Sequence, residues 1–274
     1  MNEPMKKALL YLDEDLASSM AFRFAATKTQ ELAMALQPFH VVEPEGNAPE
    51  DLGWVSRSLE KVQLAGGLDK VNRLVRTENL AWHKAGDPKI TLGDKDREIL
   101  RELACGGYSL YVEGYLSTPD HANFLNFLAA KRFRQTPCPV LLVKNLVAHE
   151  QLLLLLDRQT DGAGIVSRLT ALYGDAAGDV DLTVLYYNSG EGRDLVFQER
   201  KNGQPLDRVG ELLAQDGWYE PEWLVVQGPP EKAAGYMRGH GLVAASYPGK
   251  DGARAELLAH LANPVLLFPE QHEE

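Results

Sequence analysis

The sequence predicts an α/β protein made of two similar domains in tandem, residues 1–145 and 146–274, each a five-stranded parallel sheet with helices on both faces. Both halves open on an apolar run that ends in aspartate, KKALLYLDED in the first and HEQLLLLLDRQ in the second. Both close on the same Pro-Val-Leu-Leu, at Pro139 and Pro264. Strands and helices alternate in between, which is typical of parallel βαβ units.

The elements of the first copy follow from hydrophobic periodicity and from turn residues. Short apolar runs bounded by turn residues predict buried strands, and apolar residues at helical spacing, such as Leu16, Met20 and Phe24, predict helices. A loop rich in Pro, Gly and Asn is expected over 44–54. The strands are expected at 7–12, 39–43, 80–83, 110–112 and 139–143, and the later helices at 55–77, 94–104 and 122–135.

The second copy repeats this order in shortened form. Its strands are expected near 151–156, 181–187, 222–227, 241–246 and 264–268, and its helices near 162–173, 203–215, 230–238 and 252–261. Continuous apolar strands such as LLLLL are typical of strands that are buried on both faces. In such sheets ligands bind beyond the carboxyl ends of the strands. Asp13, Val41, Gly86 and Gly114 are therefore expected to gather on one edge of the first sheet.

Composition and charge narrow the class of function. Hydrophobic residues make up 45% and charged residues 24% of the chain, which is ordinary for a globular protein. The net charge is −11, of which residues 146–274 carry −10, so nucleic acid is not an expected partner. The longest apolar run, Leu152 to Leu156, is too short to span a bilayer. With two cysteines and no visible secretory signal, we expect a cytoplasmic protein with reduced thiols.

Five segments of the first half carry a resemblance when they are taken in order. They are KALLYLDED (7–15), FHVVE (39–43), AGDPKI (85–90), LYVEGY (110–115) and TPCPVLLV (136–143). Their order and spacing resemble the universal stress protein family, and the likeness covers the chain as two tandem copies. The resemblance implies a flavodoxin-like or Rossmann-like fold of the adenine nucleotide alpha hydrolase type. It also implies a binding or regulatory role in bacterial stress resistance.

Some members of that family bind ATP through a loop of the form Gly-x2-Gly-x9-Gly-Ser/Thr after the fourth strand. Gly114 matches the first glycine of the loop, but Ser117 stands at the second. The last glycine falls on Asn126 or on Phe127, depending on the register. Glycines let backbone N–H groups approach phosphates, whereas phenylalanine shields them. The resemblance therefore implies a degenerate phosphate site in the first domain.

The adenine end of the site is better retained than the phosphate end. The resemblance implies that adenine would be held by Asp13, at the end of the first strand, and by backbone near Val41 in the second. Three outcomes stay open: ATP, AMP or another adenine nucleotide; a small apolar ligand in a pocket lined by Phe124, Phe127 and Phe133; or no nucleotide. The alternative for these three aromatic side chains is that they pack in the hydrophobic core.

The second copy departs further from the family pattern. Asp157 matches the position of Asp13, but Arg158 and Gln159 follow it, and the spacer of the phosphate loop is largely deleted. We expect this acidic domain to be a structural partner. If the closing strands of the two halves pair antiparallel, as the family's dimers imply, two sheet edges are covered and the chain forms an internal pseudo-dimer. Further pairing into a homodimer stays open.

The sequence leaves three hypotheses of function. The leading one is a non-enzymatic stress-response protein with the degenerate adenine-nucleotide site. The second is a ligand-free scaffold that binds a protein partner. The third is a weak ATPase or phosphohydrolase, because Asp13-Glu14-Asp15 after a strand resembles the Asp-x-Asp of haloacid-dehalogenase-type enzymes. Against the third, these acids suit a helix start, where they face the positive end of the dipole. No metal site and no catalytic residue is expected.

Overall fold

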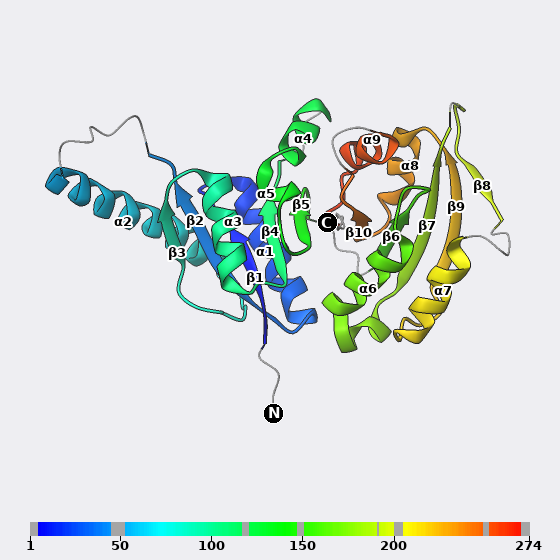
Figure 1. Cartoon of the computed structure of the whole chain (residues 1–274), viewed down its shortest axis with the longest axis horizontal. Coiled ribbons are helices and arrows are strands. Elements are labelled where there is room, and N and C mark those ends of the chain that lie inside the picture. Colours follow the sequence, from blue (N-terminus) through cyan, green and yellow to red (C-terminus); the bar gives the residue numbers. More distant parts are fainter. Residues whose placement is uncertain are drawn as a thin grey trace.

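The computed structural model describes residues 5–44, 53–116, 121–146, 151–190, 192–199, 205–248 and 252–269. Within them, eleven strands form one sheet in the order β3-β2-β1-β4-β5-β11-β10-β6-β7-β9-β8. Two large apolar clusters lie on its two faces, one under each layer of helices. Figure 1 shows the two halves side by side, with β5 near the centre.

The first half holds five parallel strands in the order 3-2-1-4-5. Its elements are β1 (Lys6–Tyr11), α1 (Leu16–Glu31), β2 (Met34–Val42), α2 (Gly53–Glu78), β3 (Lys89–Leu92), α3 (Lys95–Gly106), β4 (Leu110–Gly114), α4 (His121–Leu128), α5 (Lys131–Arg134) and β5 (Val140–Val143). The helix expected at 122–135 is therefore two short helices.

The second half repeats this strand order and adds an edge strand. Its elements are β6 (Leu152–Leu156), α6 (Gly162–Tyr173), the 3-10 helix η1 (Gly174–Asp179), β7 (Leu182–Ser189), β8 (Val196–Gln198), α7 (Pro205–Gln215), β9 (Glu222–Gly228), α8 (Pro230–Met237), β10 (Leu242–Ser246), α9 (Ala253–His260) and β11 (Val265–Phe268). Strand β8, which was not predicted, pairs antiparallel with β9. The predicted parallel α/β class and the internal repeat are confirmed.

The two halves join through the strands that end each copy. β5 pairs antiparallel with β11, with Leu141 opposite Leu266, as the closing motifs predicted. Each of these strands would otherwise expose an edge with unpaired backbone groups. Farther from this seam, the ammonium of Lys6 in β1 donates to the Ala171 carbonyl oxygen of α6 at 2.7 Å. The boundary expected between residues 145 and 146 stays a prediction.

The third strand lies later in the chain than expected. Residues 80–83 form no strand; Lys84 makes one isolated bridge to Leu36. The strand is Lys89–Leu92, which follows the turn at Gly86 and pairs with the end of β2. Trp82 packs edge-on against Phe22 at 5.4 Å, and His83 and Ala85 hydrogen-bond to the backbone of Leu36, so this segment lies beside β2 without extending into a strand.

Helix α2 is long and extends away from the body of the first half (Figure 1). Two consecutive glycines, Gly66 and Gly67, lie in its middle. At Gly67, an added Cβ would lie 2.8 Å from Val42 and 2.9 Å from Ile90, so glycine lets the helix approach β2 and β3 closely. The neighbouring Gly66 has nothing within 4 Å of the same position.

Candidate functional site

A pocket of about 540 Å³ opens beyond the carboxyl ends of β1 and β2, where ligands bind in open α/β sheets. It brings together the predicted residues Asp13 and Val41. The pocket is lined by Tyr11, Asp13, His40, Val41, Val42, Glu43, Gln63, Lys70 and Lys95. Sequence reasoning did not identify Lys95 or His40 as residues of this pocket.

Asp13 is held by the start of α1. Its backbone N–H donates to the Ser18 hydroxyl at 2.7 Å, and its own carboxylate accepts from the backbone N–H of Glu14 at 2.8 Å. Two residues on, the Asp15 carboxylate caps α1 by accepting from the backbone N–H of Ser18. Asp15 thus has the structural role at a helix start that the sequence suggested as the alternative to catalysis. One oxygen of Asp13 is left to accept from a ligand.

His40 is a buried side chain with a defined hydrogen bond. Its Nδ1 lies 2.8 Å from the Leu12 carbonyl oxygen. A carbonyl oxygen can only accept, so Nδ1 carries the hydrogen, and in the neutral ring Nε2 is the acceptor. The ring also stacks on Tyr11, with centroids 6.4 Å apart. Burial and the charge of Asp13 raise the pKa of Tyr11, so its hydroxyl stays protonated and can donate.

Lys95, the first residue of α3, connects this pocket to a buried carboxylate. Its ammonium lies 3.9 Å from the centroid of the Tyr11 ring and 2.8 Å from the Glu113 carboxylate. Glu113 comes from β4, one residue before the predicted Gly114, and is 2% exposed. The lysine therefore faces the pocket with its charge already paired.

Glu113 is the centre of an ion-pair network. Arg132 of α5 donates to it at 2.8 Å and 3.2 Å, and the Tyr111 hydroxyl donates at 2.6 Å. Burial by itself would raise the pKa of Glu113, but the positive charges and hydrogen bonds of Lys95 and Arg132 outweigh it and lower that pKa. Glu113 is therefore ionised, as a buried acid must be when two cations surround it.

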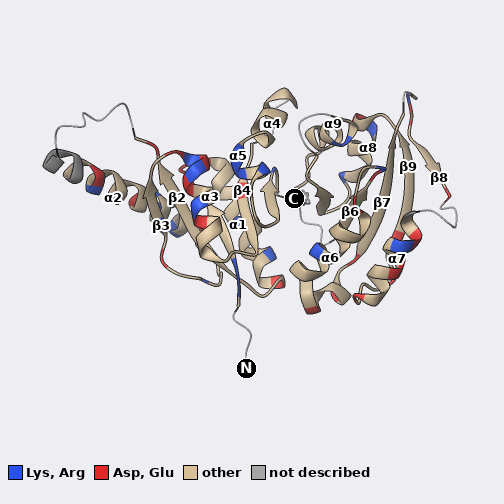
Figure 2. Cartoon of the chain, viewed as in Figure 1, with Lys and Arg blue, Asp and Glu red and all other residues tan. Residues whose placement is uncertain are grey.

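The network continues to the helices that cover the sheet. Arg132 also donates to Asp96 of α3 at 2.6 Å. Its guanidinium lies 4.4 Å from the Phe133 ring centroid and 5.0 Å from that of Phe127. Figure 2 shows Lys and Arg gathered around α3 and α5 of the first half. Lys95 and Arg132 are therefore held by internal carboxylates.

Asn126 and Phe127 are not among the residues that line the pocket. Asn126 is exposed on α4, and Phe127 packs against Tyr115 with centroids 4.7 Å apart. Phe124 and Phe133 are buried in the core, which agrees with the structural alternative to a ligand pocket. Ser117 lies outside the described residues.

Gly86 is a correction to the expected site. It precedes β3 and lies beside Gln37, whose amide donates to the Asp87 carbonyl oxygen at 2.7 Å. This places it away from the carboxyl ends of the strands. Gly93 stands there instead, with φ +153° and its backbone N–H donating to the Val42 carbonyl oxygen at 3.1 Å. The error follows from the displaced third strand.

Gly114 has a packing role at the end of β4. An added Cβ would lie 2.0 Å from the Ala17 carbonyl oxygen of α1, which is backbone and cannot move aside. We expect Gly114→Ala to lower the free energy of unfolding by about 2–3 kcal/mol, as overpacking does. Urea denaturation measures this. Gly66→Ala is the matched control and should stabilise by about 0.5–1 kcal/mol; equal effects of the two would contradict the packing role.

The corresponding pocket of the second half is lined by an ion pair. It measures about 360 Å³ and is lined in part by Asp157, Arg158 and Tyr187. Arg254 of α9 donates to both carboxylate oxygens of Asp157, at 2.7 Å and 2.5 Å. Burial would raise the pKa of Asp157, but the hydrogen bonds and charge of Arg254 lower it overall. Its carboxylate is therefore engaged, unlike that of Asp13.

The described part of the chain contains no group of three or more His, Cys, Asp or Glu side chains that could hold a metal ion. None of the helices described there is both long and apolar enough to cross a membrane.

Comparison with solved structures identifies the fold of the whole chain. A universal stress protein from Archaeoglobus fulgidus DSM 4304 matches over 98% of this chain and 97% of its own, at 13% identity and a TM-score of 0.63. A functionally unknown protein from Pseudomonas aeruginosa PAO1 matches over 97% and 92%, at 15% identity and a TM-score of 0.55. A putative universal stress protein from Pseudomonas aeruginosa UCBPP-PA14 matches over 97% and 93%, at 15% and 0.53.

These matches extend from end to end, so the chain shares the fold of these proteins across both halves. No protein-family model matches the sequence. No curated protein matches it either.

Proposed function

We propose that this chain is a tandem universal stress protein whose first half binds an adenosine-like ligand without transforming it. The observation that carries the proposal is the pocket beyond β1 and β2, where Asp13 and Val41 lie together. The Asp13 carboxylate can accept from a ribose hydroxyl or an adenine amino group, and backbone at Val41 can contact the base. The shared fold places this pocket where open α/β sheets bind ligands.

Charge selects among adenine compounds. The pocket holds Asp13 and Glu43 against Lys70 and Lys95, and the ammonium of Lys95 is already paired with Glu113. A triphosphate would bring several negative charges to a site with little unpaired positive charge. We therefore propose adenosine or AMP in preference to ATP, with affinity falling as phosphates are added.

Isothermal titration of the full chain with adenosine, AMP, cyclic AMP and ATP tests the proposal. Asp13→Ala should weaken adenosine binding by about tenfold, the equivalent of one hydrogen bond to a charged group. Asp87→Ala, an exposed aspartate at the opposite end of the strands, is the matched control and should change nothing. If none of the four compounds binds, the nucleoside proposal is wrong.

A scaffold that binds a protein partner is the second candidate. It is favoured by the Asp157–Arg254 pair, which engages the carboxylate that lines the second pocket, and by the −10 net charge of residues 146–274. If the protein is such a scaffold, the Asp13→Ala variant should bind the partner with the same affinity as the wild type. A cytoplasmic, bacterial setting and a role in stress resistance belong to the proposal through the family resemblance. Hydrolysis of ATP is not part of it.

A further inference from the structure

A second cavity, of about 330 Å³, lies between the two halves. The first half contributes Lys28 and Glu31 from the last turn of α1. The second half contributes Tyr173 at the end of α6, together with apolar side chains at the starts of β6 and β10. Asp13 precedes the first turn of α1, so the length of this helix separates the two sites. Junctions between domains are common places for small-molecule sites.

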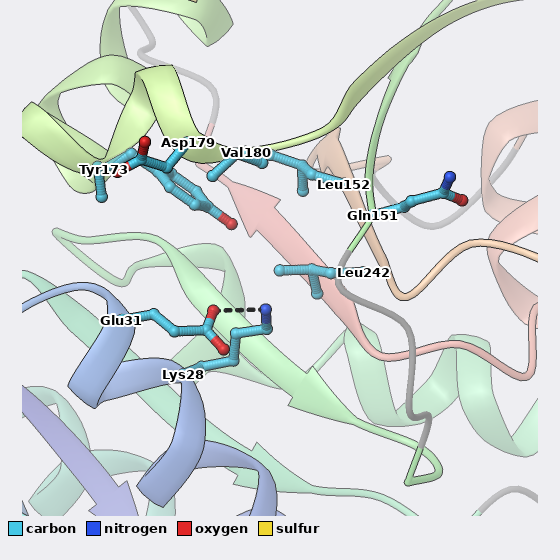
Figure 3. Close-up of a pocket in the computed structure, with 9 residues that line it drawn as sticks. Lys28, Glu31, Gln151, Leu152, Tyr173, Asp179, Val180 and Leu242 are labelled. Atoms are coloured by element: carbon cyan, nitrogen blue, oxygen red, sulfur yellow. Dashed lines mark hydrogen bonds and ion pairs between the residues drawn. The ribbon is translucent and has the colours of Figure 1, made fainter.

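The cavity holds a buried hydroxyl without a partner. Tyr173 is 6% exposed, and its hydroxyl points into the cavity toward Lys28 and Glu31 (Figure 3). Among the residues that the structure describes, none forms a hydrogen bond with it. Burial and the charge of Glu31 raise the pKa of Tyr173, so the hydroxyl stays protonated and can donate. A buried donor of this kind requires an acceptor.

Lys28 supplies a second donor beside this hydroxyl. Its side chain is 12% exposed, and its ammonium points into the cavity 2.6 Å from the Glu31 carboxylate (Figure 3). An ammonium group carries three N–H donors, so Glu31 leaves some of them to a ligand. Leu152, Val180 and Leu242 supply the apolar part of the lining. A ligand that fits therefore has an apolar body and an acceptor at one end.

The charges around the cavity disfavour a charged ligand of either sign. The Lys28 ammonium repels a cation, and Lys6 adds a positive charge where it donates to the end of α6. The Glu31 carboxylate repels an anion, and so do the C-terminal ends of α1 and α6, which carry the negative ends of their helix dipoles. Asp179 is exposed and lies away from the hydroxyl (Figure 3). Any ion would also lose hydration on entering.

We propose that this junction cavity binds a small uncharged carbonyl compound, such as an amide or a ketone. Its oxygen accepts from the Tyr173 hydroxyl and the Lys28 ammonium, and its apolar body packs against Leu152, Val180 and Leu242. Because such a ligand contacts both halves, its binding also links them. The site does not depend on the adenosine-like ligand proposed for the Asp13 pocket.

Three probes with the same aromatic ring separate the effect of charge from that of shape: phenylacetamide, phenylacetate and phenethylamine. Isothermal titration of the full chain should rank phenylacetamide tightest, about tenfold above either charged probe. Asp13→Ala should leave its binding unchanged. The proposal is overturned if no probe binds, or if phenylacetate or phenethylamine binds as tightly as phenylacetamide.

Tyr173→Phe keeps the ring and removes only the donor. It should weaken phenylacetamide binding about fivefold, as expected for one hydrogen bond between uncharged groups. Tyr219→Phe is the matched control, because Tyr219 is 74% exposed and does not line the cavity. An equal effect of the two substitutions would show that the Tyr173 hydroxyl does not hold the ligand.

Lys28→Met tests the charge directly. Without the ammonium, Glu31 loses its partner, so phenylacetamide should bind several-fold more weakly and phenethylamine several-fold more tightly. A cavity that recognised only an apolar body would not change its ranking in this way. Lys61→Met is the matched control, because Lys61 is exposed on α2 and does not line the cavity. An unchanged ranking in Lys28→Met would contradict the proposed place of the carbonyl oxygen.

Discussion

Glu113→Leu should lower the free energy of unfolding by about 3–5 kcal/mol, because it leaves Arg132 and Lys95 without their shared buried anion. Leucine keeps most of the volume, so the loss reports charge and hydrogen bonding more than a cavity. Urea denaturation at neutral pH measures the change. A loss below about 1 kcal/mol would contradict the network's place at the centre of the first half.

The double variant Glu113→Leu with Arg132→Met is the matched control. It replaces both partners of the pair by apolar groups, and we expect it to recover part of the stability lost by the single variant. The pH dependence has a definite sign. The pKa of Glu113 is lowered in the folded chain, so its contribution is present above its ordinary pKa and is lost as pH falls through the lowered pKa. Glu113→Leu should lack that acid-dependent loss.

Lys144→Met should stabilise the protein by roughly 3–5 kcal/mol near pH 6, and by much less above pH 10. Lys144 follows β5 at the seam between the halves and is 2% exposed. Its ammonium donates to the Leu258 carbonyl oxygen at 2.9 Å and lies 3.9 Å from the Phe124 ring centroid. Burial lowers its pKa to about 7. Folding therefore opposes protonation of this lysine.

The sign follows from linkage. The folded pKa is below the unfolded one, so the cost of burying Lys144 is full below about pH 7 and disappears as pH rises through about 10.5. Wild type should gain stability over that interval, and Lys144→Met should not. Thermal unfolding at several pH values tests this. Lys232→Met, on the exposed side of α8, is the control and should keep the wild-type pH dependence; an unchanged profile in Lys144→Met would refute the prediction.

Much of the fold could be predicted because its signals are local or repeated. The pairing of the two Pro-Val-Leu-Leu strands was expected from the repeated motif and from the family resemblance, because each strand would otherwise leave an edge of its sheet exposed. The third strand was misplaced because LAWH has strand-like composition, whereas in the structure this part of the chain makes an isolated bridge to β2 at Lys84 and the strand itself begins at Lys89. Strand β8 escaped prediction because it is a short, exposed edge with no hydrophobic alternation.

The candidate site was only half visible. Asp13 and Val41 follow or lie within apolar strands, so the rule that parallel strands present their carboxyl ends together was enough to join them. Glu113 could have been recognised from the sequence, because a carboxylate inside a buried strand requires a partner. The sequence does not show which cations pair with it, because Lys95 and Arg132 come from helices elsewhere in the chain.

By itself, the sequence determined the class of fold, the duplication and the aspartate that opens each half, since apolar periodicity and repeated motifs are encoded residue by residue. Only the tertiary structure decided which charged side chains pair with one another. It engages Asp157 with Arg254 and leaves a carboxylate oxygen of Asp13 to a ligand. Such pairings depend on the three-dimensional approach of distant side chains, which no local pattern records.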